Sequence, residues 1–91
     1  MFELEITTIK VVASDGLTGE VVNQLTNELS KYQFKIMLKY QGTTTIATSS
    51  LGVMSLGVPN GANIELSVDG TTEQLEAVVQ TLVDNHLVAR I

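Results

Sequence analysis

The apolar residues of this chain repeat with two different periods, and the order of these periods limits what it can fold into. Alternating apolar and polar residues are typical of a strand with one buried face, whereas apolar residues three, four and seven positions apart form a helical stripe. The patterns predict the order β-α-β-β-α-β-α. We expect strands at residues 3–13, 34–41, 43–47 and 63–69, and helices at residues 18–31, at residues 49–56 and from residue 71 onward.

Turn and capping residues separate these segments. Gln41-Gly42 supplies a tight turn between two strands, because glycine tolerates a positive φ. Thr71, followed three residues later by Gln74, is a possible capping box for the last helix. The pattern therefore predicts an α+β domain, with a four-stranded antiparallel sheet and helices packed on one face. Its 91 residues predict a single domain over residues 1–91.

The composition of the chain argues against several classes of function. The formal net charge is −5, and five basic residues are too few for a phosphate-binding stripe, so we expect no nucleic-acid partner. The chain has no cysteine, no signal-peptide-like start and no apolar run of membrane-spanning length. We therefore expect a cytoplasmic protein that does not bind membranes. His86 is the single histidine, and no metal-ligand spacing surrounds it, so neither a metal nor a cofactor is expected.

The segment Ser49-Ser50-Leu51-Gly52-Val53-Met54-Ser55-Leu56-Gly57-Val58 resembles the regulatory serine segment of the HPr family, the histidine-containing phosphocarriers of the sugar phosphotransferase system. Further landmarks agree with the family in spacing. They are Gly16-Leu17, Ser30-Lys31-Tyr32 and Lys39-Tyr40-Gln41-Gly42, and the resemblance covers residues 6–86. It implies the family's fold, an open-faced sandwich.

The chain departs from this family at the phosphate-carrying residues. The family has Gly-Leu-His-Ala-Arg-Pro, and the corresponding stretch here is Gly16-Leu17-Thr18-Gly19-Glu20-Val21. Thr18 thus occupies the histidine position and Glu20 the arginine position. A threonine hydroxyl does not replace a nucleophilic imidazole without an adjacent base, and Glu20 repels a phosphoryl group. The structural interpretation is that Thr18 caps a helix and that Glu20 complements its dipole. We expect no catalytic residue here.

By the same resemblance, Ser49 occupies the position that an HPr kinase phosphorylates. Leu17, Leu51 and Met54 are then candidates for a docking surface. The alternative interpretation is that Ser49 only caps a short helix and that Met54 packs beneath it. His86 is expected near the end of the last helix, where it is mildly favourable for the helix dipole.

These observations favour a non-enzymatic regulatory or interaction protein, similar in logic to the Crh proteins, which also lack the histidine and act through the serine. The resemblance implies protein partners such as an HPr kinase or a transcriptional regulator. Two alternatives stay open. One is a phosphocarrier of the phosphotransferase system with an unconventional acceptor, for which His86 is the only imidazole. The other is a small α+β ligand-binding domain that shares only the arrangement of layers.

Overall fold

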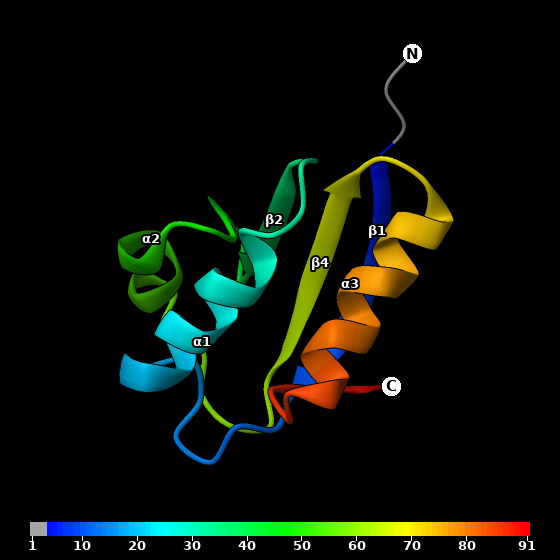
Figure 1. Cartoon of the computed structure of the whole chain (residues 1–91). Helices are drawn as coiled ribbons and strands as arrows, with labels where there is room; N and C mark the ends of the chain where they lie inside the picture. The colour runs from blue at the N-terminus through cyan, green and yellow to red at the C-terminus, as the bar shows by residue number, and fades with distance from the viewer. Residues whose placement is uncertain (1–3) are drawn as a thin grey trace.

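The computed structural model describes residues 4–91, in which one antiparallel sheet of five strands is covered on one side by three helices (Figure 1). The strand order across the sheet is β3-β2-β4-β1-β5. The elements along the chain are β1 (Leu4–Val11), α1 (Gly19–Leu29), β2 (Ile36–Tyr40), β3 (Thr43–Ile46), α2 (Ser50–Ser55), β4 (Asn63–Asp69), α3 (Thr72–Asp84) and β5 (Val88–Arg90). The α+β fold predicted from the sequence is confirmed.

The expected number of strands was wrong, because β5 adds a fifth. This short strand pairs with β1, with Val11 opposite Val88 and Ile9 opposite Arg90. It forms because α3 ends at Asp84 and the chain then turns back. His86 has a φ of 59°, and the N–H groups of His86 and Leu87 donate to the carbonyls of Val83 and Leu82. This is a Schellman motif, which satisfies carbonyls that the helix end leaves free.

Other element boundaries are close to those predicted. The strand β4 has the predicted bounds, whereas α1 is shorter at both ends than the predicted helix over residues 18–31. The predicted first strand over residues 3–13 is a strand over Leu4–Val11, and residue 3 lies outside the described residues. Gln41 and Gly42 both have positive φ, as a tight hairpin turn requires.

The capping box at the start of α3 is confirmed. The N–H of Gln74 donates to Thr71 Oγ1 at 3.1 Å, and the N–H of Thr71 donates to Gln74 Oε1 at 2.8 Å. Two of the orphan donors of the helix end are thereby satisfied.

One face of the sheet carries the core, and the opposite face is open. The inward residues of the strands pack against the apolar stripes of the helices; they include Ile9, Val11, Ile36, Leu38, Ile64, Leu66 and Val68 from the strands and Val22, Leu25, Leu29, Leu75, Val78, Val79 and Leu82 from the helices. In Figure 1 the helices lie in front of the strands. The start of α1 and the short helix α2 are therefore on the covered side, where α1 packs against α2.

Candidate functional site

The loop before α1 is held closely against the loop that follows α2. Gly16 has a φ of 75°, and a Cβ at this position would collide with the backbone of Val58 and Pro59. The N–H of Leu17 donates to the Val58 carbonyl at 2.9 Å. Because the approach is so close, only glycine fits at position 16. This packing fixes the loop that presents Thr18.

Thr18 occupies the N-cap position of α1 with an extended backbone, but its side chain makes no capping bond. Its hydroxyl instead donates weakly to the Asp15 carbonyl, at 3.4 Å. Gly19, the first residue of the helix, has a φ of 51°, outside the helical region, so the first turn is irregular. The expected capping by the Thr18 side chain is therefore wrong, although the position is that of an N-cap.

The charges near the start of α1 are negative. Thr18 and Glu20 are both exposed, and Glu20 lies in the first turn. The sequence has no lysine, arginine or histidine between Lys10 and Lys31. A phosphoryl group here would face the carboxylates of Asp15 and Glu20 without a cationic side chain from this segment. The free N–H groups of a helix start favour an anion, but these carboxylates oppose it.

The second candidate region is α2, which is positioned by Ser49 and Gly52. The Gly52 N–H donates to Ser49 Oγ at 3.2 Å, so Ser49 caps the helix as expected. A Cβ on Gly52 would collide with the side chain of Thr45 on β3. Glycine therefore allows α2 to lie directly against the hairpin. Ser49 itself is partly exposed.

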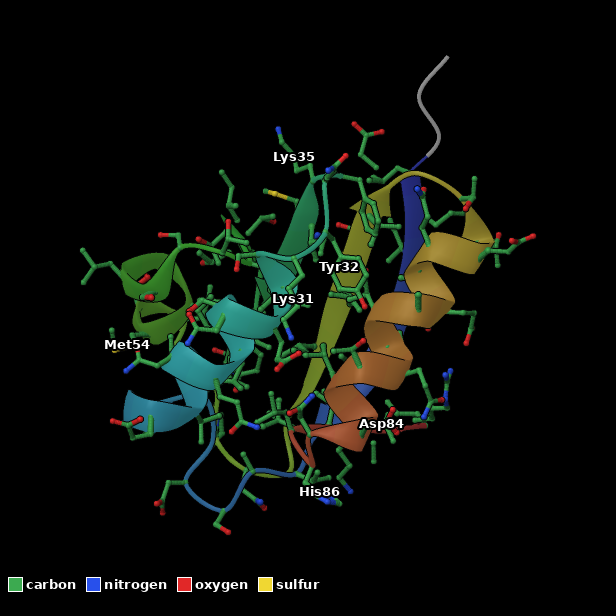
Figure 2. The ribbon with its side chains drawn as sticks, viewed as in Figure 1. Lys31, Tyr32, Lys35, Met54, Asp84 and His86 are labelled. Carbon is green, nitrogen blue, oxygen red and sulfur yellow. The ribbon has the colours of Figure 1, made fainter. Side chains whose placement is uncertain are left out.

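Two apolar side chains of α2 face solvent. Leu51 is 80% exposed and Met54 is 40% exposed, and their spacing of three residues puts them on neighbouring positions of the helix surface. Val53, between them, is fully buried beneath the helix. Met54 does not pack under α2, and in Figure 2 it projects from the helix on the side where α1 begins.

Leu17 does not belong to this exposed surface. It is only 1% exposed and lies within the core. The expectation that Leu17 contributes to docking is therefore wrong for the folded chain, because a partner cannot reach a buried side chain. Its apolar character is explained by packing against the core.

His86 is exposed in the turn between α3 and β5, well separated from Met54 in Figure 2. This turn contacts the region before and within α1. The Val12 N–H donates to the Leu87 carbonyl at 3.0 Å, and Gln24 Nε2 donates to Asn85 Oδ1 at 3.1 Å. Within residues 4–91, no three histidine, cysteine, aspartate or glutamate side chains cluster as metal ligands would.

A hollow of about 260 Å³ lies on the open face of the sheet, away from both candidate regions. It is lined by Leu4, Ile6, Met37, Lys39, Thr44, Glu65 and Ser67. Sequence reasoning did not single out these residues. The signal that could have found them is the apolar side chains at outward positions of the strands.

Among residues 4–91, no helix is both long enough and apolar enough to cross a membrane.

Comparisons with known proteins place these features in a family context. A family model described as the PTS HPr component phosphorylation site matches residues 6–85. The structure is similar to that of HPr-C-His from Thermoanaerobacter tengcongensis, with 30% identity, a TM-score of 0.76 and 88% coverage of each chain. It is also similar to a phosphocarrier protein HPr from Bacillus anthracis str. Ames, with 25% identity, a TM-score of 0.77, and coverage of 86% of this chain and 95% of that one.

A third structure supports the fold alone. It is the histidine-containing phosphocarrier protein of a Mycoplasma, with 23% identity and a TM-score of 0.79. The two structures match over 92% of this chain and 98% of that one. The similarity thus extends over almost the entire length of both molecules.

Proposed function

The chain belongs to the HPr family of the phosphotransferase system, and from this premise we propose that it is a non-enzymatic regulatory protein that does not carry phosphate on a histidine. The observation that carries the proposal is the start of α1. Thr18 occupies the position of the family's histidine and Glu20 that of its arginine, and both are exposed. The site therefore lacks both the nucleophile and the cation of a phosphate relay.

A threonine does not take over the histidine's role in this setting. The only hydrogen bond of the Thr18 hydroxyl is the weak one that it donates to the Asp15 carbonyl. The surrounding segment has no imidazole or lysine, and the Thr18 hydroxyl bonds to the backbone carbonyl of Asp15 rather than to a carboxylate that could remove its proton. Without an adjacent base, a hydroxyl remains a weak nucleophile at neutral pH.

The second half of the proposal concerns α2. We assign regulation to Ser49 and docking to Leu51 and Met54. Ser49 is partly exposed, and its hydroxyl accepts one hydrogen bond, from the Gly52 N–H at 3.2 Å. In the phosphorylated residue, a phosphate oxygen can accept from the same N–H group. Leu51 and Met54 lie within the next five residues and face solvent. A kinase or a regulator that reads Ser49 therefore meets an apolar contact beside it.

The partners that this proposal implies are an HPr kinase and a transcriptional regulator, in the cytoplasm. The logic is that of the Crh proteins, in which the serine acts and the histidine is absent. An acidic chain of net charge −5 suits a partner with a basic binding surface, because opposite charges accelerate encounter.

The test is incubation with an HPr kinase and ATP, followed by intact mass and peptide mapping. We expect one phosphate on Ser49, none on the Ser49→Ala variant and an unchanged single phosphate on Ser55→Ala, which alters another serine of the same helix. An HPr with its own serine serves as the positive control. If the control is modified and this chain is not, or if the phosphate lies elsewhere, the serine switch is wrong.

The docking assignment has its own test. Leu51→Ala and Met54→Ala should each weaken binding of the kinase several-fold while leaving the thermal unfolding midpoint within about 2 °C. The matched control is Ile91→Ala, which truncates an exposed apolar residue outside α2. Unchanged binding for both α2 variants would contradict the assignment.

One observation favours a second candidate function, a phosphocarrier with His86 as the acceptor. His86 is exposed, and its turn is hydrogen-bonded to the segment leading to α1 through Val12 and Leu87. If His86 is the acceptor, the protein should carry acid-labile phosphate, and a His86→Ala variant should carry none.

A further inference from the structure

The open face of the sheet carries apolar side chains on three of its strands. Side chains alternate along each strand, so Leu4 and Ile6 of β1, Met37 of β2 and Ile46 of β3 all point away from the helices. Ile6 is 53% exposed and Ile46 is 46% exposed. Leu4, Ile6 and Met37 line the hollow of about 260 Å³. Three of the four are among the exposed large apolar residues of the described chain, which marks the face as a candidate for contact.

The printed strand pairings arrange this face in rows across the sheet. One row runs from β3 to β1 as Ile46, Met37, Ser67 and Ile6. The next row runs in the same direction as Thr44, Lys39, Glu65 and Thr8. Each row has matching residues at its two ends, and the charged row has opposite charges at its two central positions. If a second copy lies over these rows with its strand order reversed, like residues meet at the ends and opposite charges meet in the middle.

Within the strands, the charged side chains of the open face are equal in number and opposite in sign: Lys10 and Lys39, and Glu65 and Asp69. Lys39 and Glu65 are directly opposite each other in the sheet, but the structure records no ion pair between them; the ion pairs of residues 4–91 are Lys31–Glu28 and Arg90–Glu76. Both side chains are thus available to a second molecule.

We propose that the open face of the sheet is a self-association surface, which a second copy of this chain covers through a two-fold axis running along the strands between β2 and β4. This axis reverses the order of the strands, so that β2 faces β4 and β3 faces β1 of the second copy. Lys39 then faces Glu65 of the second copy, Ile46 faces Ile6, and Thr44 faces Thr8. Each contact occurs twice, as an isologous interface requires.

An alternative two-fold axis, along the rows instead of along the strands, is less favourable. This axis keeps the strand order, so that β2 faces β2 of the second copy. Lys39 would then lie over that strand and away from Glu65 of the second copy. The charge pattern therefore selects the axis along the strands. Sheets related in this way pack nearly aligned and about 10 Å apart, which leaves room for the apolar row between them.

The area of the open face limits the affinity that we expect for the dimer. The strands β1, β2, β3 and β4 have eight, five, four and seven residues. At about 3.3 Å per residue and about 4.8 Å between strands, they cover on the order of 400 Å² per molecule. This is below the roughly 800 Å² per partner of a standard stable interface. We therefore expect a weak, reversible dimer.

The first experiment is sedimentation velocity of the full chain from about 5 μM to 1 mM, together with amide chemical shifts over the same range. We expect the mass to rise from monomer toward dimer, with concentration-dependent shifts on the open face, at Ile6, Met37 and Ser67. A monomer at 1 mM overturns the proposal. A dimer whose shifting amides lie on α2 or another surface also overturns it.

The second experiment tests the two-fold pairing by exchanging charges. Lys39→Glu and Glu65→Lys should each weaken self-association at least several-fold, because each opposes like charges twice in the dimer. An equimolar mixture of the two variants should associate at least as tightly as the original chain, because every facing pair is then opposite in charge. The repulsion within each single chain remains in the mixture, so the rescue reports contacts between molecules.

A matched pair of variants controls for net charge. Lys31→Glu and Glu73→Lys change the formal charge by the same amounts but lie on the helical side. Each should dimerise as the original chain does, and their mixture should show no preference for unlike partners. If this control pair shows the same rescue, or if the Lys39 and Glu65 variants show none, the proposed interface is wrong.

Discussion

Two threonines occupy N-cap positions in this fold, and the structure predicts very different consequences of removing their side chains. Thr71 makes both bonds of a capping box at the start of α3, at 3.1 and 2.8 Å. Thr18 stands at the same position of α1 with the same extended backbone but makes no capping bond. We therefore compare Thr71→Ala with Thr18→Ala.

The magnitudes follow from the bonds that each change removes. Thr71→Ala deletes the acceptor for the Gln74 N–H and should lower the free energy of unfolding by about 1 kcal/mol. For a domain of this length, that loss corresponds to a fall of about 5 °C in the melting temperature. Thr18→Ala deletes only an exposed, 3.4 Å bond to the Asp15 carbonyl, so the free energy should stay within about 0.5 kcal/mol.

The assay is equilibrium urea denaturation of the original chain and both variants, with thermal unfolding as a second readout. Similar losses for the two variants would refute the reasoning, because they would mean that Thr18 caps α1 after all. The comparison also bears on function. A neutral Thr18→Ala would mean that helix capping does not account for a threonine at this position.

The remaining predictions concern packing and one partly buried hydrogen bond. Val53→Ala, which removes fully buried methyl groups beneath α2, should cost about 2 kcal/mol of unfolding free energy, whereas Leu51→Ala on the exposed side should cost less than about 0.5 kcal/mol. Equal losses in urea denaturation would contradict this arrangement of α2. Tyr32→Phe should cost about 1 kcal/mol, because the Tyr32 hydroxyl lies 2.6 Å from Thr81 Oγ1 and joins the end of α1 to α3 (Figure 2). A loss of less than about 0.3 kcal/mol would indicate that water replaces this bond fully.

Local signals predicted those parts of the fold that local interactions decide. The β4 strand has strict alternation and a turn at each end, and its predicted bounds agree with the structure. The capping box of α3 was readable because it involves residues only three positions apart. The same holds for the hairpin turn at Gln41-Gly42, where two positive φ values are needed in succession.

Two errors concern contacts between residues distant in sequence. Three residues, Val88–Arg90, show too little periodicity to predict a strand, and β5 exists because it pairs with β1 at the other end of the chain. The burial of Leu17 depends on the approach of the Val58 carbonyl to the backbone at Gly16 and Leu17. Neither contact leaves a local pattern in the sequence.

Of two predicted side-chain caps near the site, one forms, and the error at the other arises between neighbouring residues. The alternative interpretation of Ser49 was that it caps α2; the cap bond, which spans three residues, is present. Thr18 was also expected to cap its helix, but Gly19 adopts a positive φ and the bond is not formed. The exposed apolar row on the sheet required the strand order and register, which the sequence patterns alone did not provide.

The central claim is that this member of the HPr family does not take part in phosphate relay through histidine. The most direct measurement is incubation with the first enzyme of the phosphotransferase system and phosphoenolpyruvate, followed by intact mass before and after mild acid, with an HPr that has its histidine as the positive control. The account predicts phosphate on the control and none on this chain. Acid-labile phosphate on this chain, lost in a His86→Ala variant, would contradict it.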